Sequence, residues 1–378
     1  MRKLRVGVIY GGRSGEHEVS LASAAAVFQH LDPSRYDAIP IRIERDGRWC
    51  LPAEPPHLVS AADAIQQARA ATPRPAPEGH LVARPGGDTM LRIDPSATPA
   101  VSGTMLDVVF PVLHGPYGED GTVQGLLELA NIPYVGAGVL ASSVGMDKAA
   151  MKLVFAACGL PICDYEVVMA REWRRDPATV LGRVGGRLGF PVFVKPANLG
   201  SSVGISKAKH AVELRAAIDL AATFDRKIVV EAAVPQPREI ECGVLGNDEP
   251  DASVPGEIVP SREFYDYEAK YLAEGSVVRI PAPLSPARTE EIRRLAVAAF
   301  KAIDGAGMAR VDFLLAGDSG TLYVNEVNTI PGFTTISMFA KMWAASGLEY
   351  RALLDRLIDL ALERHRDKQL LRTTHESP

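Results

Sequence analysis

Cysteine is scarce in this chain, and the four that occur (Cys50, Cys158, Cys163 and Cys242) form no CxxC pair. This argues against a disulfide framework and is typical of reduced thiols in a cytoplasmic protein. No apolar run approaches the ~18 residues that a membrane-spanning helix needs. The start "MRKLRVGVIYGG" is basic, but its short apolar run ends in glycines, which predicts a first strand and not a signal peptide.

An excess of positive charge is also lacking. The net charge of −5 provides no electrostatic basis for binding nucleic acid or an anionic membrane. The chain has no GxxxxGK[ST] P-loop, and "GVIYGGRSGE" lacks the G-x-G-x-x-G spacing of dinucleotide-binding proteins. What remains is a globular composition, 47% apolar and 23% charged, in 378 residues, which predicts two or three domains.

Strand and helix patterns alternate in the first third of the chain. They predict an N-terminal α/β domain over 1–137, with a parallel sheet and helices on its faces. Within it, 52–100 is rich in Pro, Ala and Gly, which predicts a surface excursion with some local helix and no part in the core. The predicted strands are 4–12, 36–43 and 106–115, and the predicted helices are 18–31 and 121–132.

Two further units follow, a central one over 138–236 and a C-terminal one over 237–378. Between them "VPQPRE" predicts a hinge, because its two prolines cannot continue a central strand. The central unit has predicted helices at 147–160 and 211–224, strands at 191–197 and 227–234, and a glycine loop at 198–204. The C-terminal unit has a predicted strand at 239–246, a loop-rich stretch, a ribbon at 307–333, and helices at 335–347 and 350–366.

The ribbon at 307–333 carries polar residues where strands ordinarily carry Thr, Val or Ile. Side chains alternate between the two faces of a strand, so Arg310 shares a face with Asp312, and Glu326 shares a face with Asn328. Two interpretations are open. The face is either a solvated surface with a cross-strand ion pair, or a set of hard oxygen ligands of the kind that Mg²⁺ prefers.

The "GDSG" between the two strands of the ribbon is typical of a turn. A hairpin centred near Asp318 predicts that Asp312 lies opposite Val324 and Arg310 opposite Glu326. In that register all the polar groups of the ribbon fall on one face, near the end away from the turn.

The glycine loop follows Lys195, which ends an apolar strand. Small residues let successive backbone N–H groups point into one concavity, and such nests bind anions. Lys195 and Lys207, with the hydroxyls of Ser201 and Ser202, would meet phosphate oxygens there. The alternative is an ordinary flexible hairpin loop. The strand that follows ends at Glu231, which suits either the edge of a nucleotide site or an exposed strand end.

A lysine, a glycine loop, a strand that ends in glutamate and an acidic ribbon, in that order, resemble the ATP-grasp superfamily. Eight segments resemble the D-alanine–D-alanine ligase family, in order from about residue 4 to 366: "YGGRSGEHEVSL", "HGPYGEDGTVQGLLE", "SVGMDK", "KPANLGSSVG", "REIECGVLGN", "FYDYEAKY", "GMARVDF" and "NEVNTIPGF". The resemblance implies a mixed α/β fold of three domains. A Rossmann-like parallel-sheet domain would come first, and ATP would lie between the central and C-terminal domains.

The resemblance also implies the reaction. ATP would phosphorylate the carboxylate of one D-alanine, and the amine of a second would attack the acyl phosphate, giving D-alanyl-D-alanine for peptidoglycan precursors. ATP with two Mg²⁺ ions, or Mn²⁺, would be the cofactors of a cytoplasmic homodimer. Two alternatives are a D-alanine–D-lactate ligase, whose relatives tend to carry histidine at the Tyr271 position, and a non-catalytic module that binds a nucleotide and an amino acid.

Matching positions suggest which residues hold the nucleotide and its metal ions. The implied metal ligands are Asp312, Glu326 and Asn328. The "AAVPQP" segment departs in detail from relatives around the backbone contacts of Ala232 and Val234. The implied ATP-binding residues are Lys148, Lys195, Ser201, Ser202, Glu231, Ala232, Val234, Glu239, Phe264, Lys270, Asn325 and Glu326.

Other matching positions concern the transferred group and the second substrate. Arg310 would stabilise charge on the phosphoryl group and on the tetrahedral oxyanion, and the N–H of Gly332 would be a second oxyanion donor. Lys270 and Ser337 would hold the carboxylate of the second D-alanine.

Glu16 matches the residue that binds the ammonium of the first D-alanine, with His114 near the same substrate. The alternatives are a helix cap for Glu16 and a core position for His114. The "FYDYEAKYLAEG" segment predicts a lid loop at 264–275 that closes over ATP and excludes water. Tyr271 in this lid would bond with Ser201 and Glu16.

Overall fold

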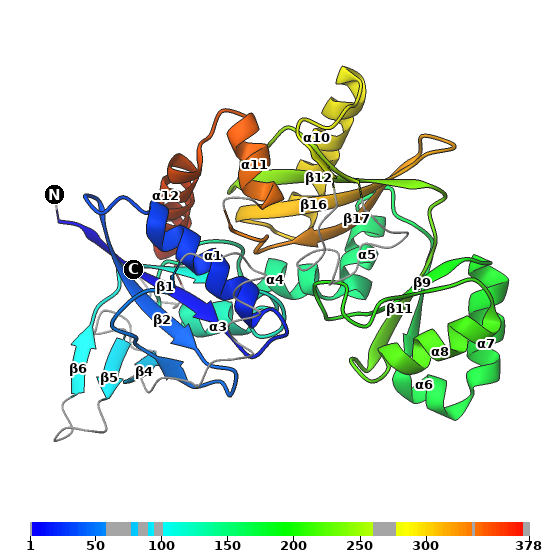
Figure 1. Ribbon diagram of the computed structural model, residues 1–378, viewed down its shortest axis with the longest axis horizontal. Helices are drawn as coiled ribbons and strands as arrows, with labels where there is room; N and C mark the ends of the chain where they lie inside the picture. Colours follow the sequence, from blue (N-terminus) through cyan, green and yellow to red (C-terminus); the bar gives the residue numbers. More distant parts are fainter. Residues whose placement is uncertain are drawn as a thin grey trace.

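The structure, a computed structural model, describes residues 2–57, 77–81, 90–93, 101–259, 277–334 and 337–372. It contains three β-sheets that follow one another along the chain, each packed against helices (Figure 1). Among the described residues no helix combines the length and the apolar character that crossing a membrane requires.

The first sheet has seven strands in the order β6-β5-β4-β3-β2-β1-β7. Only part of it is parallel: β1 (Leu4–Gly11) pairs in parallel with β2 (Tyr36–Ile43) on one side and with β7 (Val108–Val112) on the other. β7 and most of β1 are buried, which explains their nearly continuous apolar sequences. These three strands lie where the sequence predicts them.

The other side of this sheet is antiparallel, and here the prediction needs correction. The segment 52–100 was expected to be an excursion outside the core, but its strands β4 and β5 continue the sheet, and Met90 is buried. Strands that are consecutive in the chain and adjacent in this part of the sheet pair antiparallel, whatever the Pro and Gly content of the segments between them. The local helix predicted there lies outside the described residues. The added strands are β3 (Trp49–Cys50), β4 (Glu78–Leu81), β5 (Met90–Ile93) and β6 (Val101–Thr104).

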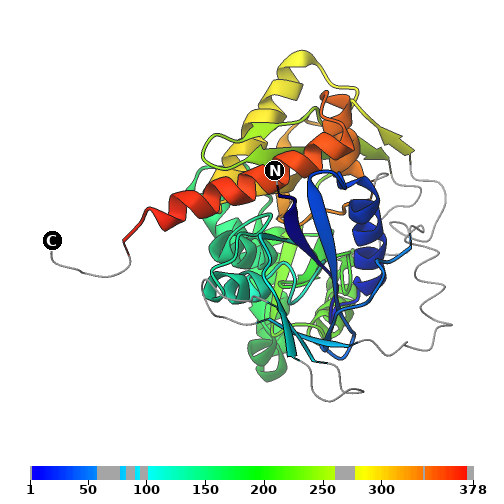
Figure 2. The same cartoon turned by 90° about the vertical axis from the view of Figure 1, so that its left-hand side faces the viewer.

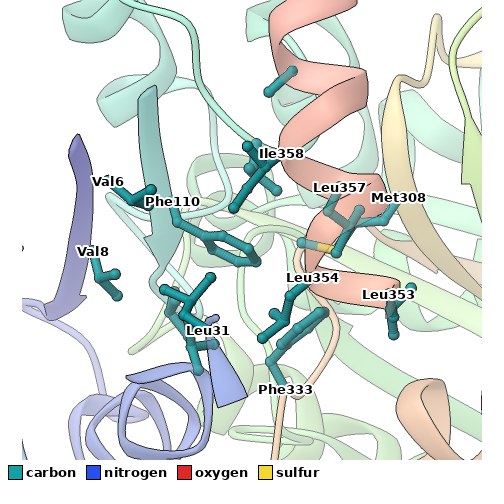
Figure 3. Packing of buried hydrophobic residues seen from close by; sticks show 14 of the residues in the cluster. Val6, Val8, Leu31, Phe110, Met308, Phe333, Leu353, Leu354, Leu357 and Ile358 are labelled. Carbon is teal, nitrogen blue, oxygen red and sulfur yellow. The ribbon is translucent and has the colours of Figure 1, made fainter. Parts of the chain in front are cut away.

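Two helices from opposite ends of the chain cover one face of the first sheet: α1 (His17–His30) and α12 (Tyr350–Gln369). Val6, Val8 and Phe110 of the sheet pack in one cluster with apolar residues of α12 (Figure 3). The long α12 therefore lies across the N-terminal sheet, as Figure 2 shows. The opposite face packs against α3 (Thr122–Leu129), which is followed by α4 (Val139–Met146).

The central sheet has four antiparallel strands in the order β10-β9-β11-β8. One face carries Val168, Val194 and Val230, which pack under three helices (Figure 1). The strands are β8 (Tyr165–Met169), β9 (Val192–Pro196), β10 (Ser206–Ala208) and β11 (Lys227–Ala232). The helices are α6 (Ala170–Arg175), α7 (Pro177–Leu188) and α8 (Ala211–Ala221).

The C-terminal sheet has the strand order β15-β14-β12-β16-β17, with β13 paired to β12. Its strands are β12 (Pro237–Gly246), β13 (Asp251–Ala252), β14 (Gly256–Val259), β15 (Val277–Arg279), β16 (Gly307–Ala316) and β17 (Leu322–Asn328). One face packs against α5 (Lys148–Ala157) and α10 (Pro286–Ala302), and α11 (Met338–Ala345) packs near the other face, against Gly243.

Two predictions in this part of the chain are wrong. The helix α10 occupies a stretch that was expected to be loop-rich, although Ser285 caps it by accepting from the Arg288 N–H and Pro286 begins it, both typical helix-start signals. The predicted hinge extends too far, because β12 already begins at Pro237. A proline is tolerated at the first residue of a strand, where a ladder hydrogen bond is not required of it.

Candidate active site

The polar ribbon is formed by β16 and β17, and its register differs from the prediction. Asp312 lies opposite Glu326, and Arg310 lies opposite Asn328. A β-bulge shifts the pairing after Asp312, so that Phe313 pairs with Val324. All the polar groups still share one face, but each predicted pair is displaced by two residues along β17.

The bulge has a packing cause. Val324 and Val327 are both buried, although an odd spacing would place them on opposite faces of a regular strand. One extra residue in the strand lets both point into the core, and it leaves Asn325 and Glu326 together toward the other side. The bulge therefore adds Asn325 to the polar groups at this end of the ribbon.

Arg310 is the centre of a buried ion network. Its Nε and Nη2 each donate to Asp312 at 2.6 Å, and its Nε lies 3.1 Å from Glu241 Oε2 on the neighbouring β12. Asn328 donates to Asp312 at 3.0 Å. Burial by itself would lower the pKa of Arg310, but the charges of Asp312 and Glu241 outweigh it and raise that pKa well above its usual value. Glu241 was not predicted, although "EIECG" places it on the same face as Glu239.

The oxygen donors of the ribbon fit a magnesium ion. Asp312, Glu326 and Asn328 offer two carboxylates and an amide, and Mg²⁺ commonly takes one or two carboxylates and completes its shell with water and phosphate. In the described part of the chain, no three His, Cys, Asp or Glu residues form a cluster that could hold a metal by themselves. Arg310 binds both oxygens of Asp312, so a metal ion there would share Asp312 with a guanidinium.

Two buried lysines face this end of the ribbon. Lys148, the first residue of α5, donates to the carbonyl of Leu199 at 2.7 Å, and its Nζ is 3.8 Å from Glu326 Oε2. Lys195 of β9 donates to Asn325 Oδ1 at 3.4 Å. Burial would lower the pKa of Lys195, but the charges of Glu231 and Glu326 outweigh it, so the pKa rises and the ammonium stays charged.

The glycine loop meets the N-terminal domain. Ser201 and Ser202 adopt positive φ angles of 50° and 59°, which L-residues rarely adopt outside turns and functional loops. Ser201 donates its hydroxyl hydrogen to Glu16. A Cβ added to Gly200 would lie 2.7 Å from Glu16 Oε2, so a side chain at this position would displace the Glu16 carboxylate.

Glu16 occupies the N-cap position of α1, but its side chain makes no capping hydrogen bond. Its carboxylate contacts Ser201 instead, and it is closed in by Gly200 on one side and Gly115 on the other. The side chain is thus directed toward the other domain and away from the helix that it begins.

His114 is buried and makes hydrogen bonds to protein groups at both ring nitrogens. Its Nδ1 lies 3.2 Å from the carbonyl of Ile330, so this nitrogen carries the hydrogen, and Nε2 accepts from Ser23 at 3.1 Å. Burial lowers its pKa, which keeps the ring neutral. Ser23 in turn accepts from the N–H of Phe333 at 3.3 Å, so His114 fastens the loop that carries Gly332 to the first domain.

Glu119 lies in the same region and was not predicted. Its carboxylate accepts from the N–H groups of Gly115 at 2.7 Å and of Ile330 at 3.1 Å. Burial, and then the nearby charge of Glu16, raise its pKa to about 8. The "GPYGEDG" sequence was a usable signal, because acids between glycines can reach the backbone of neighbouring loops.

The remaining predicted residues are placed as follows. A Cβ at Gly332 would lie 3.3 Å from Ser337 Oγ, and Ser337 accepts from the N–H of Thr334 at 3.0 Å. The N–H of Ala232 donates to the carbonyl of Asp164. Ser202, Val234 and Glu239 are half-buried. Phe264, Lys270, Tyr271 and the whole predicted lid at 264–275 lie outside the described residues.

Glu231, predicted at the nucleotide edge, is buried between two lysines. Its Oε2 lies 2.7 Å from Lys195 Nζ, and its Oε1 lies 3.0 Å from Lys152 Nζ. Burial alone would raise the pKa of this carboxyl, but the two ammonium charges outweigh it and lower the pKa to about 2. Lys152 was not predicted, because a lysine within an apolar helix pattern gives no signal of burial.

Comparisons with known proteins agree over nearly the whole chain. The family pattern described as D-ala D-ala ligase N-terminus matches residues 5–137, and the one described as D-ala D-ala ligase C-terminus matches residues 154–359. The chain is 50% identical over 369 residues to a D-alanine–D-alanine ligase from Heliobacterium modesticaldum, covering 98% of this chain and 97% of that one. A ligase of the same name from Geobacillus thermodenitrificans is also 50% identical, over 374 residues, covering 99% of this chain and 100% of that one.

Solved structures give the same result. The D-alanine–D-alanine ligase from Coxiella burnetii superimposes with a TM-score of 0.80 at 37% identity, covering 98% of this chain and 97% of that one. A D-Ala:D-Ser ligase from Enterococcus faecalis superimposes with a TM-score of 0.81 at 34% identity, covering 95% of this chain and 100% of that one.

Proposed function

Because the chain belongs to the D-alanine–D-alanine ligase family, we propose that it joins two D-alanines with ATP at the polar face of the β16–β17 ribbon. The enzyme is an ATP-dependent ligase of the ATP-grasp fold, and its product D-alanyl-D-alanine serves peptidoglycan precursor synthesis. One observation carries the location of the chemistry: two buried lysines meet the polar end of the ribbon, Lys148 beside Glu326 and Lys195 at Asn325.

The reaction proceeds in two bond exchanges. A carboxylate oxygen of the first D-alanine attacks the γ-phosphorus of ATP, the bond to the β-phosphate oxygen breaks, and ADP leaves. The amine of the second D-alanine then attacks the acyl carbon, and phosphate leaves with the bonding pair. Both steps gather negative charge on oxygens, so positioning and electrostatic stabilisation supply most of the rate acceleration.

Each cation at the site has a proposed role in this charge stabilisation. Lys148 and Lys195 would neutralise ATP phosphates, and Arg310 would stabilise the transferring group and the oxyanion, together with the N–H of Gly332. Arg310 suits this role because its raised pKa keeps it charged at every working pH. Asp312, Glu326 and Asn328 would hold two Mg²⁺ or Mn²⁺ ions, whose contribution is to neutralise phosphate charge.

The substrates would meet at the junction of the domains. Glu16 would bind the ammonium of the first D-alanine, and its contact with Ser201 supports this, because it places the carboxylate beside the glycine loop. Lys270 and Ser337 would hold the carboxylate of the second D-alanine. Tyr271 would close over the site and bond with Ser201, which provides a route for the proton that the attacking ammonium must lose.

The nucleotide would lie between the central and C-terminal sheets. Ser201 and Ser202 would contact phosphate, and Ala232, Val234 and Glu239 would line the adenine and ribose. Glu231 was expected to contact the ribose through its carboxylate, but both of its oxygens contact lysines, so it would act on the nucleotide through Lys195. Phe264 and Asn325 complete the proposed ATP site. We propose a homodimer as the assembly and the cytoplasm as the location, since the cell keeps its ATP there.

A phosphate-release assay tests the function. Phosphate should appear from ATP with D-alanine and not with L-alanine, and the product should be the D-alanine dipeptide by mass spectrometry. Adding D-lactate or D-serine as the second substrate tests the range, since the related D-Ala:D-Ser ligase shows that the fold accepts another nucleophile. Nucleotide binding without phosphate release would instead favour a non-catalytic module.

Tyr271 is the residue to vary for the D-lactate alternative. A neutral phenol, with an unperturbed pKa of ~10, adds no cation near the incoming ammonium. Histidine there would be protonated below a pKa near ~6.5 and would disfavour the ammonium nucleophile. In competition between D-alanine and D-lactate, Tyr271→His should gain the ester product as the pH falls. If the wild type and Tyr271→His gave the same ratio of the two products at every pH, Tyr271 would not select between the nucleophiles.

A further inference from the structure

A second lysine of α5 lies one turn after Lys148 and has no role in the reaction described above. Asp147 caps this helix by accepting from the N–H groups of Ala149 and Ala150, which sets where the helix begins. Residues four apart lie on the same side of a helix, so Lys148 and Lys152 extend from one side of α5. Lys148 donates to the carbonyl of Leu199 and Lys152 contacts Glu231 of β11, so both reach the central domain.

Lys152 is completely buried, which is rare for a lysine unless it is paired. Its Nζ lies 3.0 Å from Glu231 Oε1 and 5.9 Å from the centre of the Tyr165 ring. Among the described residues the ammonium has no other charged partner within ion-pair distance. A buried charge of this kind is retained only where something compensates it.

The carboxylate of Glu231 is shared. Its other oxygen contacts Lys195 at 2.7 Å, and Lys195 also donates to Asn325 on the bulge of the ribbon. Two cations and one anion leave this buried group with a net charge of +1. Without Lys152, Glu231 and Lys195 would form a neutral pair, and the attraction of Lys195 for a phosphate would fall. The excess charge acts strongly there because water does not screen it.

We propose that Lys152 is a positioning residue for ATP: by sharing the Glu231 carboxylate, it leaves the charge of Lys195 available to the ATP phosphates. The inference rests on the proposed function, since it needs ATP to lie against Lys195. Lys152 itself does not contact the nucleotide. Its effect passes through Glu231 and Lys195, and it should therefore depend on the phosphates of the ligand and not on its base.

The test compares ligands with and without phosphates. Binding of ATP, ADP and adenosine to the full-length protein is measured by calorimetry for the wild type and for Lys152→Met, whose side chain has a similar shape and no charge. We expect ATP to bind at least tenfold more weakly to the variant, which corresponds to about 1.4 kcal/mol. Adenosine should bind within twofold of wild type, and the KM for ATP should rise while the KM for D-alanine is unchanged.

The chain offers a matched control on the other face of the same sheet. Glu166 also lies between two cations, Arg183 and Arg187, at 3.5 and 2.6 Å. Arg187→Met removes one cation from a mostly buried carboxylate in the same way. This variant should leave the affinities for both ATP and adenosine unchanged, because its carboxylate does not contact Lys195.

Several outcomes would overturn the inference. Equal weakening of ATP and adenosine would make Lys152 a purely structural residue, and an unchanged ATP affinity would remove it from the site. If Lys152→Met does not fold, Lys152→Gln is used, because its uncharged amide can still donate to Glu231. Failure of both variants to fold would assign Lys152 to the fold alone. Wild-type protein that binds ATP but releases no phosphate with D-alanine would contradict the proposed function and not this inference.

Discussion

The two faces of the central sheet each bury a carboxylate between two cations, and yet the consequences differ. On the face under α7, Glu166 contacts Arg183 and Arg187, whose side chains are 37% and 62% exposed. On the opposite face, Glu231 contacts Lys152 and Lys195, which are 1% and 11% exposed.

The difference lies in where the cations end. The arginines of α7 run along the sheet and carry their charge into water, where salt and solvent screen it. Lys152 and Lys195, on the other face, are buried from water. Their charge therefore acts on whatever enters between the domains. The same arrangement of three charges therefore stabilises the surface on one face and prepares an anion site on the other.

The largest expected effect concerns the ribbon, whose Asn325 accepts a hydrogen bond from Lys195. Glu326→Gln removes an anionic ligand for metal and should lower kcat by about 10³-fold, since metal charge stabilisation is worth several kcal/mol. Circular dichroism should show an unchanged fold. Asp318→Asn in the exposed turn of the same hairpin is the control and should be fully active. A Glu326→Gln enzyme with near-native phosphate release at ordinary magnesium would remove Glu326 from the metal site.

The next effect is the acid sensitivity of the stability that the Glu231 carboxylate contributes. The pKa of Glu231 is lowered from 4.5 to about 2 in the folded protein, so its ionised form contributes stability above pH 4.5 that is lost as the pH falls toward 2. The shift corresponds to about 3 kcal/mol. Urea unfolding of the wild type and Glu231→Gln at pH 7, 5, 4 and 3 should show the two free energies of unfolding converging below pH 4.5. Curves that stay parallel over this range would contradict the assigned shift.

A smaller effect is expected where the glycine loop contacts Glu16. Gly200→Ala would bring a Cβ to 2.7 Å from Glu16 Oε2, and the carboxylate must move to admit it. We expect the KM for D-alanine to rise about tenfold, or ~1.4 kcal/mol, with little change in the KM for ATP. Steady-state kinetics with each substrate varied separately measures this. If both KM values rise together, the loop as a whole has moved and the contact with Glu16 is not the cause.

The smallest effect is expected for a glycine on the helix-covered face, which serves as the counterpart of Gly200. Gly182 lies inside α7 beside open space, so the Cβ that Gly182→Ala adds would meet nothing within 4 Å. Alanine should stabilise the helix by about 0.5–1 kcal/mol and leave both KM values unchanged. Thermal unfolding and the same kinetic assay measure it. A kinetic effect comparable to that of Gly200→Ala would mean that the two faces are not functionally distinct.

Local patterns in the sequence determined much of this molecule. The apolar runs at β1, β2 and β7, the helix periods at α1 and α12, and the alternation of polar residues in the ribbon are each visible within a few residues. Period and turn chemistry act over such distances, so they can be predicted without a partner. The family, and with it the reaction, also followed from segments that stand in order along the chain.

The tertiary structure alone decided which distant groups meet. The bulge at Asn325 exists because Val324 and Val327 must both enter one core, and no local pattern states where that core lies. Lys152 and Glu231 are far apart in sequence, and only packing α5 against the central sheet removes both from water. The lowered pKa of Glu231 is likewise a property of the complete fold, because desolvation and neighbouring ions depend on what packs around the carboxylate.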